Sequence, residues 1–195
     1  KKTLHIDEAL LLEARAASGA RTDTDTVRLG LEALTRQGDY ERLRALRGTE
    51  PRASNVPAIE GRRAVEVQAT SGLMVLVDTS VWIRFLAGRR PYANALDDLL
   101  GRGEVSGHDL IYGELLLGDA SGRRALLEDS AAMHRAPTVS HTEVVAFVKQ
   151  RRLRGRGVGW IDAHLLASAL VGRLGLWTAD ARLAAVAREI GISHD

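Results

Sequence analysis

Several features are absent from this sequence of 195 residues, and each absence excludes a class of protein. There is no cysteine, so the chain forms no disulfide bonds and uses no thiolate chemistry. No apolar stretch approaches the roughly 20 residues that are needed to cross a bilayer, and there is no secretory leader. Neither sign of charge dominates, because the net charge is only +2. We therefore expect a cytoplasmic protein without a membrane partner.

The signatures of several enzyme classes are also missing. The glycines around Arg102 and Arg156 lack the spacing of a dinucleotide-binding fingerprint, and no Gly-Lys-Ser/Thr phosphate loop occurs. There is no His-Glu-x-x-His zinc helix and no Gly-x-Ser-x-Gly nucleophile elbow. A phosphatase with an aspartyl nucleophile would carry a second aspartate two positions after Asp78, where this chain has Ser80.

What the sequence does contain is a set of acidic residues in stretches otherwise too apolar to hold a charge, namely Asp78, Glu114, Asp162 and Asp180. We call these four residues the acid quartet. Burying a lone carboxylate costs several kcal/mol or forces it to take up a proton, so buried carboxylates usually share a cation. A divalent metal ion is the natural candidate.

Two members of the acid quartet follow predicted strands. Residues 73–77 form a short apolar run that is typical of a buried parallel strand, and Asp78 stands at its carboxyl end. Asp180 ends a second strand-like run, residues 174–180, and a helical segment follows it. Open α/β sheets bind ligands at the carboxyl ends of their strands. Capping of the following helix is the alternative role for either aspartate, and the sequence leaves it open.

The other two members lie on predicted helices. If residues 110–117 are helical, the neighbours of Glu114 on the helix face are Leu110, Ile111 and Leu117. Asp162 likewise shares its face with Leu165, Leu166 and Ala169. Both carboxylates are therefore expected on the core side of their helices. We predict that the acid quartet meets at one edge of a sheet.

The segments around these acids resemble the acidic motifs of PIN-domain ribonucleases of the VapC toxin type. They are residues 77–82, 113–115, 159–167 and 177–183, and the likeness runs from about Met74 to the C-terminus in the family's order and spacing. The resemblance implies a Rossmann-like α/β/α sandwich with a parallel sheet. It also implies an endoribonuclease that depends on Mg²⁺ or Mn²⁺, with the acid quartet as catalytic residues and metal ligands and with Ser80 supporting the first aspartate. The RNA that it suggests is a structured one, such as tRNA or ribosomal RNA.

The chemistry of these residues agrees with that resemblance. Hard cations prefer carboxylate oxygens, and Mg²⁺ usually keeps several waters while only a few protein ligands hold it. A water made more acidic by the metal can attack a phosphodiester in line, so no covalent nucleophile is needed. Whether one or two ions bind is left open by the sequence.

The first third of the chain has a different organisation. Residues 2–7 alternate between polar and apolar like a half-buried strand. A helix is predicted from Asp7 or Glu8 to Ser18, and Gly19 ends it. A second helix is predicted to have Thr24 as its N-cap and to end near Gly38. A strand and two helices of this size bury too little to be stable alone, so the unit needs a twin.

This unit resembles the ribbon-helix-helix antitoxins of the VapB type, on residues 4–10 and 19–27. In that family two strands pair into an antiparallel ribbon that enters the major groove of DNA. The resemblance implies an operator-binding segment that autoregulates transcription. It places Lys1, Thr3 and His5 against bases and Thr24 near phosphate. For His5 the alternative is an ordinary solvated strand residue.

Residues 39–73 have the composition of an arm and a linker. Residues 40–47 predict a short amphipathic helix, and prolines, serine, asparagine and glycines follow it. In antitoxins of this kind the arm wraps the toxin and an arginine reaches the acidic pocket. Arg44 and Arg47 are favoured for that inhibitory role over Arg42 and Arg52, and a solvated charged helix face is the alternative.

A cluster of arginines leads directly into Asp162, namely Arg151, Arg152, Arg154 and Arg156. Beside a metal site these side chains are expected to guide an RNA backbone, since phosphate neutralisation gives affinity that is independent of sequence. A polar helix end with a flexible loop is the alternative. His164 is expected to have no catalytic role, because it projects from the side of a helix opposite Asp162. The three tryptophans, which have apolar neighbours, are expected to be packing residues.

Together these features predict three segments: a DNA-binding module over residues 1–38, a toxin-wrapping arm and linker over 39–73, and a PIN ribonuclease domain over 74–195. Toxin and antitoxin are normally separate chains, so a natural or an engineered fusion is expected. Residues 59–62 match a protease site that is often built into engineered joins. By the same likeness the partners are cognate toxin and antitoxin subunits in assemblies up to a hetero-octamer. The alternative function is a transcriptional regulator with a non-catalytic PIN-like domain.

Overall fold

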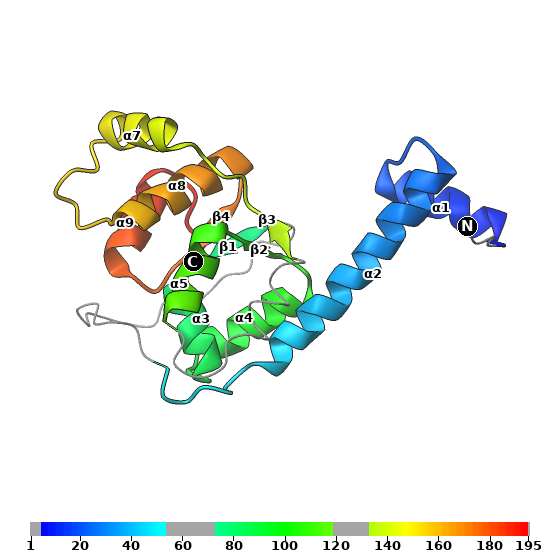
Figure 1. Cartoon of the computed structure of the whole chain (residues 1–195), viewed down its shortest axis with the longest axis horizontal. Helices are drawn as coiled ribbons and strands as arrows, with labels where there is room; N and C mark the ends of the chain where they lie inside the picture. Colours follow the sequence, from blue (N-terminus) through cyan, green and yellow to red (C-terminus); the bar gives the residue numbers. More distant parts are fainter. Residues whose placement is uncertain (1–4, 54–72, 119–132, 195) are drawn as a thin grey trace.

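The computed structural model describes residues 5–53, 73–118 and 133–194 (Figure 1). Figure 1 shows a helical arm, made of α1 and α2, that projects from an α/β domain, which comprises the elements from β1 to α9. The elements in chain order are α1 Glu8–Ser18, α2 Asp23–Ala45, β1 Val75–Val77, α3 Thr79–Leu86, α4 Tyr92–Gly101, β2 Val105–Gly107, α5 Asp109–Leu117, β3 His134–Arg135, α7 His141–Gln150, α8 Trp160–Gly172, β4 Gly175–Trp177 and α9 Ala181–Glu189. None of the helices in the described ranges is long and apolar enough to cross a membrane.

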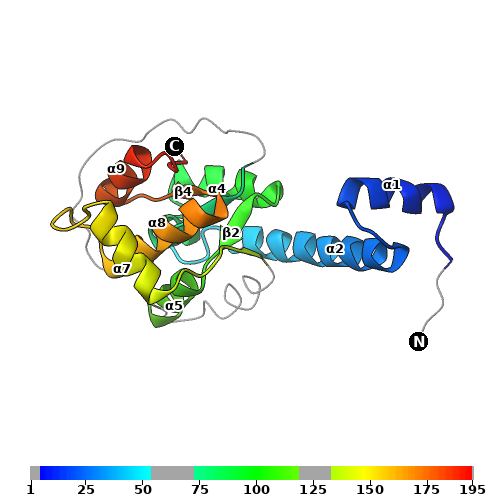
Figure 2. The same cartoon turned by 90° about the horizontal axis from the view of Figure 1, so that it is seen from above.

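A parallel sheet of four strands in the order β3-β2-β1-β4 forms the centre of the α/β domain. All three residues of β1 are fully buried, as expected for an inner strand with both faces covered. Helices flank the sheet (Figure 2), and their largest fully buried side chains include Phe85, Leu96, Leu165 and Leu183. The predicted α/β class, its parallel sheet and the strand before Asp78 are therefore confirmed.

The first predicted helix is confirmed at both ends. The side chain of Asp7 accepts a hydrogen bond of 2.9 Å from the backbone N–H of Leu10, which caps the start of α1. Gly19 ends the helix with φ +66°, the left-handed conformation that glycine adopts without strain.

The predicted bounds of the second helix are wrong. Its N-cap is Thr22, whose hydroxyl accepts from the N–H of Asp25, and Thr24 lies inside the first turn. The helix does not stop near Gly38 but continues to Ala45, so it includes residues 40–45 of the separate short helix expected over residues 40–47. A glycine inside a helix costs about 1 kcal/mol relative to alanine. Here the packing of the residues that follow Gly38 outweighs that cost.

That packing fixes the second half of α2 in the α/β domain. Tyr40 and Leu43 belong to the same hydrophobic cluster as the sheet, and Leu43 is fully buried. The hydroxyl of Tyr40 donates a buried hydrogen bond of 2.6 Å to the carbonyl oxygen of Val105 on β2. The chain beyond the helix stays attached, because the N–H of Gly48 donates to the carbonyl of Phe85. This part of the helical arm is therefore a structural component of the α/β domain.

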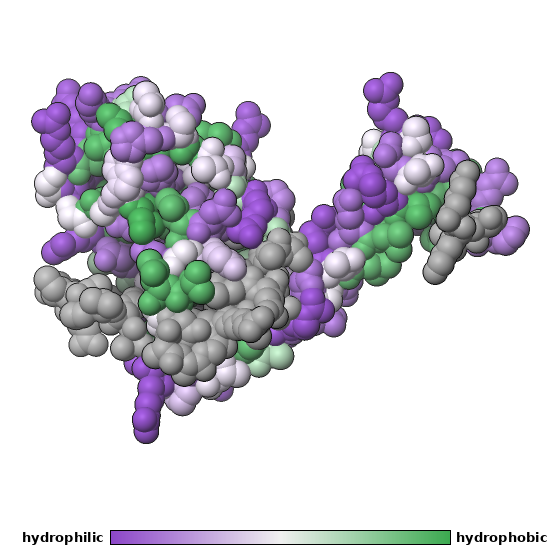
Figure 3. All heavy atoms as spheres, in the orientation of Figure 1, coloured by the Kyte–Doolittle hydropathy of each residue, from purple (hydrophilic) through white to green (hydrophobic). Residues whose placement is uncertain are grey.

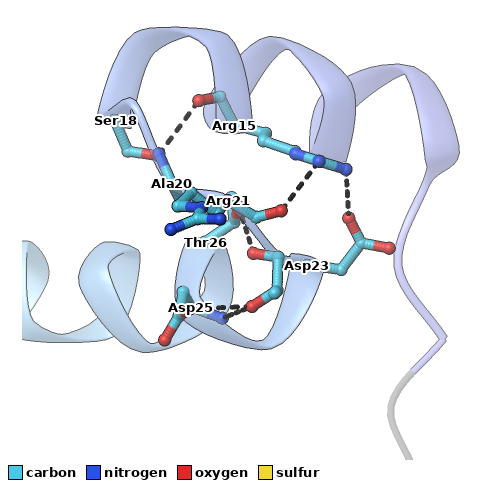
Figure 4. Close-up of polar contacts among 8 residues, drawn as sticks. Arg15, Ser18, Ala20, Arg21, Asp23, Asp25 and Thr26 are labelled. Carbon is cyan, nitrogen blue, oxygen red and sulfur yellow. Dashed lines mark hydrogen bonds and ion pairs between the residues drawn. The ribbon is translucent and has the colours of Figure 1, made fainter.

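The outer part of the helical arm is held mainly by polar contacts at the corner between its helices (Figure 4). Nη2 of Arg15 on α1 donates a hydrogen bond of 2.8 Å to the carbonyl oxygen of Arg21. Nη1 of the same side chain lies 3.4 Å from Oδ1 of Asp23. The structure describes α1 completely, and none of its residues is buried. Figure 3 shows an apolar stripe along α2, and the exposed large apolar residues of the arm are Ile6, Leu10, Leu12, Leu31 and Leu34.

Half of the predicted DNA-reading strand, residues 2–4 of 2–7, lies outside the described residues. Lys1 and Thr3 lie among residues 1–4, and the protease-site match at residues 59–62 lies within 54–72, both beyond the described ranges. His5 is exposed and has no regular secondary structure. Pairing into a ribbon therefore stays a prediction.

Candidate active site

The ends of two neighbouring parallel strands bring two members of the acid quartet to the same edge of the sheet. Val77 of β1 pairs with Trp177 of β4, and the N–H of Asp78 donates 2.9 Å to the carbonyl of Trp177. Asp78 follows the last residue of β1, and Asp180 comes three residues after the end of β4. This is the carboxyl edge at which open α/β sheets bind ligands.

A hydroxyl network joins these two strand ends. Oδ2 of Asp78 accepts hydrogen bonds from the hydroxyls of Ser80 and Thr178, the latter at 2.8 Å. The Thr178 hydroxyl also accepts a hydrogen bond of 3.0 Å from the N–H of Asp180. The Ser80 hydroxyl accepts one of 3.0 Å from the N–H of Ala179. Ser80 thus lies beside the first aspartate, and Asp78 is held in one orientation although only 6% of its surface is exposed.

Both aspartates also cap the helices that follow them. The Asp78 side chain accepts from the N–H of Ser80 at the start of α3. Oδ1 of Asp180 accepts hydrogen bonds of 2.8 Å and 3.0 Å from the N–H groups of Arg182 and Leu183 at the start of α9. The alternative role that the sequence left open is therefore present, and the acidic-site role does not compete with it, because capping uses one oxygen of each group.

Glu114 lies on α5 and points toward the start of α3. Its Oε2 accepts 2.6 Å from the hydroxyl of Thr79. Burial raises the pKa of Glu114, and the negative charges of Asp78 and Asp162 raise it further, while the Thr79 hydrogen bond lowers it. The predicted face of α5 is only partly right: Ile111 is 3% exposed, whereas Leu117 is 88% exposed at the last position of the helix.

Asp162 lies in the first turn of α8. Its Oδ2 accepts 2.7 Å from the N–H of Gly159, the residue before the helix. Burial raises the pKa of Asp162; the Gly159 hydrogen bond opposes this, and the charges of Asp78 and Asp180 add to it. The predicted neighbours on its helix face, Leu165, Leu166 and Ala169, are all fully buried.

The members of the acid quartet thus interact through their charges, although their side chains do not converge on one position. The described residues contain no group of three or more His, Cys, Asp or Glu side chains that is arranged to hold a metal ion as it stands. Each carboxylate is instead turned toward a hydrogen-bond donor on its own or a neighbouring element. Carboxylates whose negative charges help to raise the pKa of Glu114 and Asp162 fit a hard cation chemically. In these hydrogen bonds each carboxylate uses one of its two oxygens, which leaves the other for a cation.

Two of these donors were not singled out by the sequence analysis. Thr79 and Thr178 each stand within two residues of an acid, but their contacts reach Glu114 across 35 positions and Asp78 across 100 positions. A threonine beside each strand-end aspartate was the available signal. Which carboxylate each hydroxyl would meet depends on the folded sheet.

The two arginines predicted to enter the acidic site lie elsewhere in this structure. Arg44 makes a two-pronged contact with Asp97 on α4, from Nε to Oδ1 at 3.0 Å and from Nη2 to Oδ2 at 3.1 Å. Arg47 contacts Asn94 and lies 3.8 Å from Asp97. Their inhibitory role stays a prediction, and it requires both side chains to leave Asp97.

The predicted RNA-backbone arginines lie in the loop between α7 and α8. Arg151, Arg152 and Arg154 are exposed, whereas Arg156 forms an ion pair with Glu189 of α9. Exposed guanidinium groups just before Asp162 agree with a contact to phosphate, which stays a prediction.

Known proteins resemble both parts of the chain. The family model of the PIN domain matches residues 75–189. Ribonuclease VapC32 of Mycobacterium tuberculosis is 46% identical over 121 residues, which make up 62% of this chain and 95% of that protein. Antitoxin VapB32 of the same organism is 37% identical over 57 residues, which make up 29% of this chain and 88% of that protein. No solved structure gives a significant match.

Proposed function

The chain belongs to the PIN-domain family and carries a second part related to a VapB antitoxin, and from this we propose that it is a toxin-antitoxin unit. In this proposal the α/β domain is an endoribonuclease that depends on Mg²⁺ or Mn²⁺. The main support is that Asp78 and Asp180 follow neighbouring parallel strands at the same edge of the sheet. The charge of Asp78 also contributes to the raised pKa of both Glu114 and Asp162.

The acid quartet would hold the cation, and its neighbours would fix the geometry. A bound divalent ion supplies an activated water and offsets charge on the phosphate. Ser80 and Thr178 keep Asp78 in one orientation, and Thr79 does the same for Glu114. The exposed arginines before α8 would hold the phosphates of the RNA, for which tRNA and ribosomal RNA are the proposed substrates.

The helical arm would act as the antitoxin. Its inner half is anchored in the α/β domain through Tyr40 and Leu43, so the antitoxin segment stays attached to the nuclease that it restrains. Its outer half leaves apolar residues exposed on both helices, which favours pairing with a second arm. In the paired form Lys1, Thr3 and His5 would read operator DNA, with Thr24 near phosphate, and thereby autoregulate transcription. Pairing of arms would also link nuclease domains into larger assemblies.

The test of the nuclease is RNA cleavage by residues 74–195 in chelator, Mg²⁺ or Mn²⁺, with and without residues 1–53 as a separate chain. Because residues 74–195 lack the anchor that Tyr40 and Leu43 of α2 supply, near-ultraviolet circular dichroism first checks that they are folded. We expect cleavage that requires metal and that the separate antitoxin segment suppresses. Asp78→Asn should lower the rate about 100-fold or more, because even indirect partners of a metal are worth 10–100-fold. Asp98→Asn, a change of the same charge at an exposed position on α4, is the matched control. Equal cleavage by the parent and Asp78→Asn contradicts the proposal and assigns the activity to a contaminant.

A further inference from the structure

One tryptophan departs from the expectation that all three are packing residues. Trp82 and Trp177 are 2% and 4% exposed, whereas Trp160, the first residue of α8, is 45% exposed. The prediction is therefore wrong for Trp160. Leaving a large indole ring in water forgoes hydrophobic stabilisation, which makes an exposed tryptophan beside a candidate active site a binding candidate.

Neighbouring rings fix the orientation of Trp160. The ring of His141, at the start of α7, lies 5.0 Å from it at an interplanar angle of 52°. The ring of His164, one turn further along α8, lies 4.9 Å from it in an edge-on arrangement at 85°. An aromatic surface held from two sides loses little conformational freedom when a ligand binds, which favours affinity.

The surroundings of Trp160 select for an anionic ligand. The loop that leads into α8 carries the exposed side chains of Arg151, Arg152 and Arg154. Within the described ranges no ion pair engages Arg152 or Arg154. These three arginines precede Trp160 by six to nine positions in the chain. Proteins bind single-stranded nucleic acid by combining cations, which contact phosphates, with aromatic rings, which stack on bases.

Trp160 lies within reach of a strand that is bound at the acid quartet. Asp162 follows two positions later and points to nearly the opposite side of α8. A helix with its side chains is about 10–12 Å across. A strand that contacts both residues would pass around the first turn of α8, a path of a few nucleotides.

We propose that Trp160 is a stacking platform for an unpaired base of the RNA, a few nucleotides from the phosphodiester that the acid quartet cuts. This inference rests on the proposed nuclease function and names how its substrate is held. Stacking uses the face that every base has, so the platform tolerates any sequence but requires single-stranded RNA.

The chain contains its own probe for this contact, because Trp160 is the exposed member of the three tryptophans. The full chain with Asp78→Asn, in chelator, is titrated with a single-stranded RNA of ten adenosines and with a ribose-phosphate strand of equal length that lacks bases. We expect the adenosine strand to quench tryptophan fluorescence and to bind at least about fivefold more tightly, since stacking contributes about 1–3 kcal/mol per base. Equal affinity of the two strands, with no quenching, overturns the proposal.

Substitutions then assign the effect to Trp160. Trp160→Ala should remove the quenching and the preference for the strand with bases, while Trp160→Phe should keep most of that preference. Val171→Ala changes another exposed apolar residue of α8, 64% exposed, and should have no effect. Unchanged RNA binding by Trp160→Ala overturns the proposal. A change in sedimentation without a change in RNA binding also overturns it and shows that the ring contacts protein. The binding assay needs no cleavage, so an inactive parent would contradict the nuclease function while leaving the stacking result readable.

Discussion

The two halves of α2 belong to different folding units. The structure describes every residue of α2. In the outer half of this helix only Thr26 is buried, and Leu31 and Leu34 are 58% and 67% exposed. In the inner half Asp39, Tyr40 and Leu43 are buried, and Tyr40 and Leu43 belong to the hydrophobic cluster of the α/β domain. One continuous helix thus connects a unit that lacks a hydrophobic core with a unit that has one. The difference indicates that the outer half depends on a partner, whereas the inner half already has its own.

The largest effect is expected from breaking the inner anchor. Leu43→Ala should lower the free energy of unfolding of the full chain by about 2–5 kcal/mol, the range for leucine truncations in a packed core. Leu34→Ala on the same helix removes the same atoms from an exposed position and should change the unfolding of the α/β domain by less than about 0.5 kcal/mol. Urea denaturation followed by near-ultraviolet circular dichroism measures both. Equal destabilisation by the two variants would refute the division of α2.

A second experiment tests whether the outer half needs a partner. Leu34→Glu places a charge in the exposed apolar stripe and should weaken self-association at least tenfold, about 1.4 kcal/mol, because a carboxylate in an apolar interface loses its hydration. Analytical ultracentrifugation over a concentration series measures the association, and Leu117→Glu on the α/β domain is the control at another exposed leucine. If the parent chain is monomeric throughout, the paired-arm model is wrong.

The smallest effect concerns the acid quartet, where a buried charge on Glu114 destabilises the α/β domain. The pKa of Glu114 is raised in the folded chain, mainly by burial, so the folded state holds its proton to higher pH than the unfolded state. The free energy of unfolding therefore falls as the pH rises from the pKa of Glu114 in the unfolded chain to its higher pKa in the folded chain. In chelator, Glu114→Gln should raise the Tm by a few degrees at pH 8, and the gain should vanish below about pH 4, where unfolded glutamate is also protonated.

Glu143→Gln is the matched control for that change. Hydrogen bonds from Ser140 lower the pKa of Glu143, so its charge favours the folded state and its stabilisation is lost as pH falls through that lowered value. The substitution should therefore give no gain at pH 8. A gain of similar size in both variants would show that the effect comes from net charge and not from burial at the acid quartet.

Local rules predicted much of the fold and failed where distant residues intervene. Asp7 and Gly19 predicted both ends of α1, and the apolar run before Asp78 predicted β1, because capping and strand burial act over a few residues. The expected end near Gly38 failed, since Leu43 gains a core contact that no local pattern reveals. Thr24 was chosen as N-cap where Thr22 serves, because both threonines precede the same helix with similar local chemistry.

The sequence by itself determined which carboxylates stand in apolar surroundings, where the two strands β1 and β4 that precede Asp78 and Asp180 lie, and to which family the two parts are related. Only the tertiary structure decided that Thr178 meets Asp78, that α2 runs unbroken into the α/β core and that Trp160 stays exposed. The physical reason is the range of the interactions. Backbone hydrogen bonds, caps and hydrophobic periodicity act between near neighbours, whereas burial and side-chain contacts depend on segments that meet only after the sheet has formed.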